Sequence, residues 1–170
     1  MLFRSDFSNI KLFAMDVDGT LTDGKIYIGN DGEVMKAFNA KDGLGIKLLI
    51  KKGIVPIIIT GRRSKIVTRR CEEIGITVLY QGVRDKADIL KNVMAKYDCT
   101  PEQTVYIGDD MNDLSAMQTA GITFAPADCA AALLPYVDFV LTQKSGDAPV
   151  REAIDIILEN RLTLSDYESI

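Results

Sequence analysis

The sequence predicts an α/β protein with a doubly wound parallel sheet. Short apolar runs rich in β-branched residues alternate with longer amphipathic stretches, and this alternation is typical of parallel strands covered by helices. The chain has 170 residues, 47% of them apolar, which is enough for one domain with a full hydrophobic core. Because no internal repeat, low-complexity segment or linker interrupts the pattern, we expect a single domain over residues 1–170.

The expected strands and helices follow one another regularly. The apolar runs that predict strands are residues 12–15, 55–59, 77–80, 104–107, 122–125 and 139–141. The stretches that predict helices are residues 43–52, 64–74, 85–97, 111–119, 128–135 and 149–159. Thr100 followed by Pro101 predicts a further helical start, because proline is favoured in the first turn after a threonine cap.

Residues 25–38 depart from this alternation and predict an inserted β-hairpin. Asp31 and Gly32 lie between stretches of alternating apolar residues, which is a typical signal for a hairpin turn. The segment directly follows the first predicted strand. We therefore expect the hairpin to stand over the site at the end of that strand.

The composition excludes several classes of function. The chain has no histidine, which rules out Ser-His-Asp and Cys-His chemistry and histidine-ligated metal sites. Acid–base chemistry near pH 7 then falls to carboxylates or a lysine. A formal net charge of −4, with no long run of one sign, argues against nucleic acid as the main partner.

The same composition bears on location. No apolar stretch reaches the roughly 18 residues of a transmembrane helix, and residues 1–6 lack the apolar segment of a signal peptide. Cys71, Cys99 and Cys129 form no CxxC pair and no zinc-binding spacing, so we expect reduced thiols. A cytoplasmic protein without a membrane partner is the expectation.

The most informative segment is Asp16-Val-Asp18-Gly-Thr, directly after the first predicted strand. Asp-x-Asp-Gly is also a common turn composition, so by itself the segment fits an ordinary turn. Open α/β sheets, however, bind ligands at the carboxyl ends of their strands. A carboxylate at that edge can ligate a hard divalent cation or act as a covalent nucleophile.

Further polar residues follow other predicted strands. Thr60 ends the second strand, Lys86 begins the helix after the third, and Asp109, Asp110 and Asp113 follow the fourth. Taken singly, each fits a turn, a helix cap or a solvated helix face. Together they supply carboxylates for Mg²⁺, and a hydroxyl and an ammonium group for phosphate oxygens. Because parallel strands bring these ends to one crevice, the set predicts phosphoryl chemistry.

These residues resemble the motifs of the haloacid dehalogenase superfamily. Over most of the chain the resemblance narrows to the capless family that hydrolyses 3-deoxy-D-manno-octulosonate 8-phosphate (KDO 8-phosphate). The segments that carry it are Asp16-Val-Asp18-Gly-Thr, the 25–38 hairpin, Phe38-Asn-Ala-Lys-Asp-Gly43, Thr60-Gly-Arg62, Tyr80-Gln-Gly82, Lys86, Gly108-Asp-Asp-x-x-Asp113 and Arg151-Glu152. The resemblance implies a Rossmann-like core with an inserted hairpin, no cap domain, and a cytoplasmic homotetramer that serves lipopolysaccharide synthesis.

The resemblance also implies roles for individual residues. Asp16 would be the nucleophile and a Mg²⁺ ligand. Asp18 would be the general acid and base, and would bind Mg²⁺ through its backbone carbonyl. Asp109 would be the third protein ligand of the ion. Thr60 and Lys86 would hold the phosphoryl group.

The remaining implied roles concern support and substrate recognition. Asp110 and Asp113 would support the metal site. Arg62 falls where the family places a residue that faces the sugar acid, and an arginine there suits a substrate carboxylate. Related enzymes that act on nonulosonate 9-phosphates, of KDN or N-acylneuraminate, place a glutamate at this position, so Arg62 favours the octulosonate.

The chain departs from the family pattern before Arg151. The family usually carries Gly-Gly-x-Gly-Ala there, whereas this chain has Ser145-Gly-Asp-Ala-Pro149. In the family this region and the C-terminal tail can reach a neighbouring subunit's site. The substitution therefore leaves the sugar and the tail contact open, while the phosphatase chemistry does not depend on it.

Other functions fit part of the pattern. A phosphatase of another small sugar phosphate needs the same residues, and a phosphomutase needs a means of holding its intermediate, which a small capless chain lacks. A non-catalytic module that binds Mg²⁺ or phosphate is the alternative outside enzymes. Such a module would not need both Asp16 and Asp18.

Overall fold

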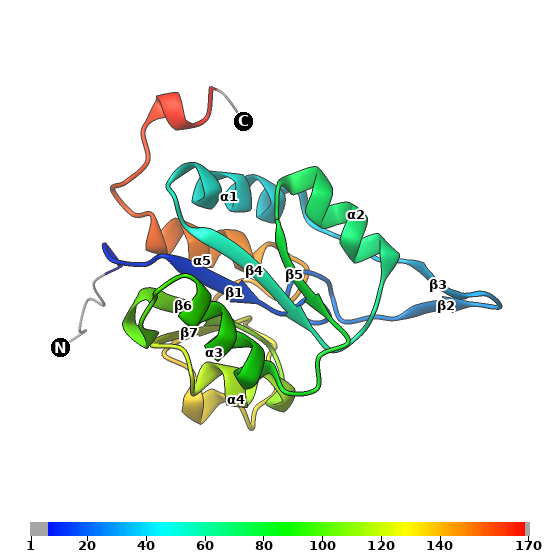
Figure 1. The fold of residues 1–170 in the computed structure, drawn as a ribbon. Helices are drawn as coiled ribbons and strands as arrows, with labels where there is room; N and C mark the ends of the chain where they lie inside the picture. Colours follow the sequence, from blue (N-terminus) through cyan, green and yellow to red (C-terminus); the bar gives the residue numbers. More distant parts are fainter. Residues whose placement is uncertain (1–6, 169–170) are drawn as a thin grey trace.

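The structure, a computed structural model, describes residues 7–168 (Figure 1). Residues 1–6, on which the expectation of no signal peptide falls, and residues 169–170 lie outside this description. A six-stranded parallel sheet has the order β5-β4-β1-β6-β7-β8. Its strands are β1 (Leu12–Met15), β4 (Val55–Thr60), β5 (Val78–Gln81), β6 (Thr104–Ile107), β7 (Ile122–Ala125) and β8 (Phe139–Val140). Each lies where the sequence predicts a strand, with small differences at the ends.

Strand β1 is the centre of the sheet. Met15 at its carboxyl end is in register with Ile58 of β4 on one side and with Ile107 of β6 on the other. All residues of β1 are fully buried, since neighbouring strands and helices cover both faces. The chain continues to opposite sides of β1, so the crevice beyond its end is a topological switch point, the usual ligand site of such sheets.

Helices cover both faces of the sheet, which confirms the doubly wound architecture (Figure 1). Helices α1 (Ala40–Lys51), α2 (Lys65–Ile74) and α5 (Pro149–Ile157) share one core with Phe13 and Met15. Helices α3 (Lys86–Lys96) and α4 (Leu114–Met117) share the other core with Leu12 and Ala14. The alternation of these four residues along β1 follows from the two-residue repeat of a strand. None of the helices in residues 7–168 combines the length and apolarity needed to cross a membrane.

Side-chain caps determine where the helices begin. Asn39 accepts a hydrogen bond from the Lys41 backbone N–H, and α1 therefore begins three residues before the predicted residue 43. Ser64 caps α2 through the Val67 N–H, and Asp85 caps α3 through the Asp88 N–H. Pro101 begins a short 3₁₀ helix after Thr100, where a helical start is predicted.

The helix predicted over residues 128–135 is wrong. Turns occupy this segment, followed by a 3₁₀ helix, Leu134–Tyr136. The Ala130 N–H donates to the Asp109 carbonyl at 2.8 Å, so the segment is bound to the loop after β6 rather than to itself. Pro135 has no N–H to contribute to a helix. The helix predicted over residues 111–119 is shorter, with a 3₁₀ turn before α4.

The predicted hairpin is present. Strands β2 (Tyr27–Gly29) and β3 (Gly32–Met35) pair antiparallel and project from the body of the molecule beside α2 (Figure 1). Ile28 and Val34 are 69% and 62% exposed, so the hairpin presents apolar side chains to its surroundings. At its base Lys36 is buried and points back to the edge of the sheet that carries the first motif.

Candidate active site

A cluster of carboxylates lies at the carboxyl edge of the sheet. Asp16 follows β1, and Asp109 and Asp113 follow β6, the neighbouring strand. Oxygen atoms of these side chains all lie within 4.8 Å of one another. Parallel pairing of β1 and β6 therefore brings together residues that are about ninety positions apart in the chain.

Lys86 lies at the centre of this cluster. It is the first residue of α3, and its Nζ lies 3.0 Å from an Asp16 oxygen and 2.7 Å from an Asp113 oxygen. Burial favours the neutral amine, but the two carboxylates outweigh it and raise the lysine pKa above its ordinary value. The two carboxylates therefore favour the charged form of Lys86 in a buried position.

Asp113 orients its neighbours rather than facing a ligand. One carboxylate oxygen accepts hydrogen bonds from Lys86 and from the Tyr106 hydroxyl, both at 2.7 Å. The other accepts from the backbone N–H groups of Asp109 and Asp110, at 3.1 and 3.5 Å. Because both oxygens are engaged, the supporting role expected for Asp113 fits its contacts. Asp110 caps the following 3₁₀ helix, the structural reading left open for it.

Gly19 and Thr20 of the first motif position Asp109. A Cβ atom at Gly19 would lie 2.0 Å from an Asp109 oxygen, and the Gly19 φ of +92° also favours glycine. The Thr20 hydroxyl donates to the other Asp109 oxygen at 3.2 Å. Gly19 and Thr20 thus fix the position of the Asp109 carboxylate, which comes from the loop after β6.

The cluster carries uncompensated negative charge. Burial, together with Asp113, raises the Asp16 pKa to about 6. Burial, together with Asp16 and Asp113, raises the Asp109 pKa to about 7. A single lysine cannot neutralise these groups, so a cation with a preference for oxygen ligands fits between them.

Asp18 stands apart from this cluster. One of its carboxylate oxygens accepts a hydrogen bond from the Lys36 ammonium group at the base of the hairpin. The other lies 3.9 Å from Nε of Arg62, a half-exposed side chain. Of the predicted site residues, Asp18 and Arg62 are therefore adjacent.

Thr60 lies at the same edge of the sheet. It ends β4, the strand next to β1, and its side chain is buried. Its carbonyl accepts a hydrogen bond from the Val83 N–H, which ties the loop after β5 to this edge. The structure thus places every predicted site residue at or beside the carboxyl ends of β1, β4 and β6.

Sequence reasoning missed several residues that hydrogen-bond or pair with the site carboxylates and so orient them. Tyr106 donates to Asp113 from inside β6. Lys36 of the hairpin reaches Asp18, and Glu33 in turn holds Lys36. A tyrosine in an apolar strand has the pattern of a core residue, so no local signal marks it. Lys36 lies near the end of the hairpin predicted over residues 25–38, and that position was the one available signal.

The segment that departs from the family pattern contacts the first motif. The Ser145 hydroxyl donates to the Gly19 carbonyl, and the Gly146 N–H donates to the Thr20 carbonyl at 3.3 Å. Asp128 holds the same serine from the other side, at 2.9 Å. The loop therefore supports the motif through polar contacts of its own.

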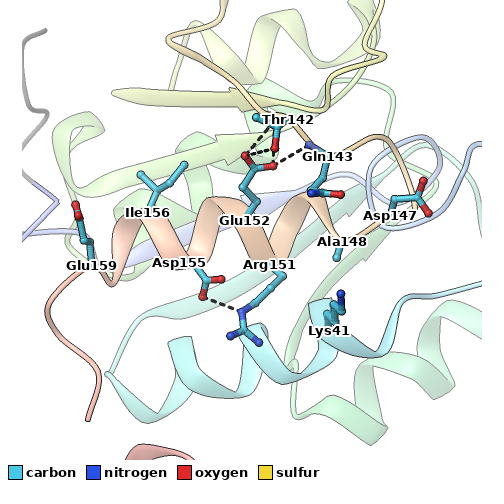
Figure 2. A pocket seen from close by; sticks show the side chains of 10 residues that line it. All are labelled: Lys41, Thr142, Gln143, Asp147, Ala148, Arg151, Glu152, Asp155, Ile156 and Glu159. Carbon is cyan, nitrogen blue, oxygen red and sulfur yellow. Dashed lines mark hydrogen bonds and ion pairs between the residues drawn. The ribbon is translucent and has the colours of Figure 1, made fainter. Parts of the chain in front are cut away.

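A wide groove of roughly 780 Å³ lies elsewhere, along α5 and the segment 142–148 before it, with Lys41 of α1 at its edge (Figure 2). Figure 2 shows Arg151 paired with Asp155, and Glu152 turned toward the backbone of Thr142 and Gln143. None of the carboxylates of the cluster lines this groove. The groove therefore lies apart from the carboxylate cluster at the strand ends.

The fold and the site define a class of protein. The site combines a carboxylate after the central strand, a buried lysine beside it, and neighbouring carboxylates that could hold a cation. These are the kinds of group that phosphoryl transfer requires. Their order along a doubly wound sheet is that of the haloacid dehalogenase-like hydrolases. A sequence model of that family matches residues 75–154.

Comparisons with known proteins narrow the class. The 3-deoxy-D-manno-octulosonate 8-phosphate phosphatase KdsC of Yersinia pestis is 47% identical over 151 residues, which are 89% of this chain and 81% of the relative. The Moraxella catarrhalis phosphatase solved with magnesium, phosphate and KDO has a TM-score of 0.88 at 39% identity, covering 92% of this chain and 90% of that one. The cobalt-bound Haemophilus influenzae phosphatase has a TM-score of 0.90 at 37% identity, covering 95% and 98%. The chain belongs to the KDO 8-phosphate phosphatase family of haloacid dehalogenase-like hydrolases.

Proposed function

We propose that this protein is a Mg²⁺-dependent phosphatase that hydrolyses KDO 8-phosphate to KDO and phosphate. The observation that carries the proposal is the contact of Lys86 with Asp16 inside the carboxylate cluster, in a chain 47% identical to a named KDO 8-phosphate phosphatase. The lysine is placed to receive phosphoryl oxygens next to the carboxylate that attacks. A non-catalytic binding module has no need of that pairing.

The reaction has two steps. Asp16 attacks the phosphorus atom and forms an aspartyl phosphate, while the P–O bond to the sugar breaks and the leaving oxygen takes a proton from Asp18. Water then gives a proton to Asp18 and attacks the acyl phosphate, which releases phosphate and restores Asp16. A bound Mg²⁺ would supply positive charge that offsets the carboxylates and the phosphoryl oxygens. Asp16, Asp109 and the Asp18 backbone carbonyl would hold the ion.

The other site residues bind and support. Lys86 and Thr60 hold the phosphoryl oxygens, and Lys86 is kept charged by its carboxylate neighbours. Asp110 and Asp113 hold the loop that carries Asp109. Arg62 receives the substrate carboxylate, and its half-exposed side chain lies at the open face of the site.

The substrate assignment is tested by comparing two sugar acids. Phosphate release from KDO 8-phosphate and from KDN 9-phosphate is measured side by side, with Mg²⁺ and with EDTA. We expect metal-dependent release with a preference for the octulosonate. Preference for the nonulosonate, or for a generic ester alone, would keep the phosphatase and reject the substrate. If no phosphate is released under any condition, the alternative of a non-catalytic module that binds Mg²⁺ or phosphate is favoured instead.

We also propose that the enzyme acts as one domain per chain in a cytoplasmic homotetramer. A capless site needs other walls to exclude water from a small sugar phosphate, and apolar hairpins from neighbouring subunits can supply them. The cysteines are free thiols in the described part of the chain, which suits a reducing compartment. A substrate on the route to lipopolysaccharide suits the same compartment.

A further inference from the structure

Lys36 is a buried cation for which the reaction above has no use. It follows β3 directly, at the base of a hairpin whose other side chains are largely exposed. Its own side chain is only 1% exposed. A charged group in such a position requires partners, because removing an ammonium group from water is costly.

Its partners connect the hairpin with the proposed acid and base. The Lys36 ammonium group donates to one oxygen of Asp18 and lies 2.9 Å from an oxygen of Glu33 in β3. The other Glu33 oxygen accepts the hydroxyl of Ser64, the cap of α2. Glu33 of β3, itself fixed by Ser64 at the start of α2, therefore holds Lys36 in place, and Lys36 holds Asp18.

The position of Asp18 explains what such a contact achieves. Three other carboxylates lie close together after β1 and β6, and Asp18 must stay out of that cluster to reach a leaving oxygen. Arg62 is 3.9 Å away and half-exposed, so it restrains Asp18 less than the buried lysine does. Proton transfer requires a donor within hydrogen-bond reach, and that reach depends on a fixed side chain.

The geometry points to Lys36 as a positioning residue: it holds the Asp18 carboxyl group where it can transfer a proton to and from the leaving oxygen. The inference rests on the proposed role of Asp18. Stability alone is a poor reason for the contact, since an apolar side chain of similar size often replaces a buried ion pair without loss.

The test uses esters that depend differently on acid catalysis. Substituted phenyl phosphates of similar size carry leaving phenols of different acidity, and only poor leaving groups need a proton from Asp18. The parameter is kcat/KM, because it reports the step in which the leaving group departs. For Lys36→Met we expect a loss of about ten-fold or more with the least acidic phenol and less than about three-fold with p-nitrophenyl phosphate.

Two further variants separate positioning from folding. Lys36→Arg keeps a cation and is expected to restore most of the activity toward poor leaving groups. Lys52→Met removes a partly exposed lysine that pairs with Asp166, far from the site, and is expected to leave the leaving-group dependence unchanged. Thermal unfolding of each variant shows how much stability was lost.

A double variant tests whether Lys36 acts through Asp18. In an Asp18→Asn background, Lys36→Met is expected to cause no further loss toward poor leaving groups. An equal loss for all phenols, or losses that multiply in the double variant, would overturn the inference and indicate direct substrate contact. If the wild-type protein hydrolyses no ester, the proposed function fails and the inference with it; turnover with unchanged leaving-group dependence rejects the inference alone.

Discussion

At the scale of single residues, the site consists of a reactive part and a supporting part. Asp16 and Asp109 have raised pKa values because they are buried beside other carboxylates. A bound cation would therefore stabilise their ionised forms. Both Asp113 oxygens already accept hydrogen bonds, one from Lys86 and the other from the backbone of the loop that carries Asp109. Residues of the same type thus have different roles because of their contacts.

Replacing Asp16 by asparagine tests the nucleophile. The amide keeps the shape of the side chain but does not form an acyl phosphate, so we expect turnover to fall by at least about 10³-fold. Phosphate release measures the loss, and circular dichroism checks that the fold survives. Normal activity of Asp16→Asn would reject the assignment.

Asp42 is expected to make the stability of the fold depend on pH. It is buried at the start of α1, one oxygen accepts the Arg151 N–H at 2.7 Å, and the other has no hydrogen-bond partner among residues 7–168. Burial raises its pKa to about 7. A carboxyl group whose pKa is higher in the folded state stabilises the fold below its unfolded pKa, and that stability is lost as pH rises through about 7.

The measurement is the free energy of unfolding between pH 5 and pH 8, with Mg²⁺ present to keep the site carboxylates constant. Asp42→Asn keeps the acceptor for Arg151 but carries no charge. We expect the variant to lose less stability than the wild type over this range, by roughly 1–3 kcal/mol. Identical pH dependence of the two proteins would contradict the raised pKa.

At the scale of elements, local signals identified most strands and helices. The strands around the site are short apolar runs, and helices α2 and α3 begin at side-chain caps near the predicted starts. The error over residues 128–135 has a tertiary cause, because this backbone bonds to the Asp109 loop. Local propensity contains no information about such a partner.

At this scale we predict that the exposed apolar face of the hairpin mediates contact between subunits. Ile28→Asp places a charge on an exposed apolar strand that we expect to contact another subunit. Because Ile28 is 69% exposed, the monomer fold should survive, while the tetramer dissociates into smaller species in sedimentation velocity. Leu134→Asp, at an exposed apolar position outside the hairpin, is the control expected to stay assembled. A monomeric wild-type protein would remove the argument.

At the scale of the whole molecule, the sheet brings distant motifs to one edge and the charge there requires an ion. Mg²⁺ that binds the folded state alone raises its stability, by about 2.7 kcal/mol at a hundred-fold excess over Kd. We expect Mg²⁺ to raise the unfolding temperature and EDTA to abolish turnover. Asp109→Asn should lose the temperature rise, whereas Asp155→Asn, on α5, should keep it. An unchanged rise in Asp109→Asn would contradict the metal site.

The sequence by itself determined the alternation of strands and helices, the hairpin, and the identity of the residues at the strand ends. These follow from periodicity, turn chemistry and residue type, which act over a few positions. The tertiary structure decided which carboxylates are engaged and which are free, since Tyr106, Thr20 and Lys36 reach their partners across the fold. Burial and neighbouring charge arise only when separate strands pack together, and those two quantities give each carboxylate its role.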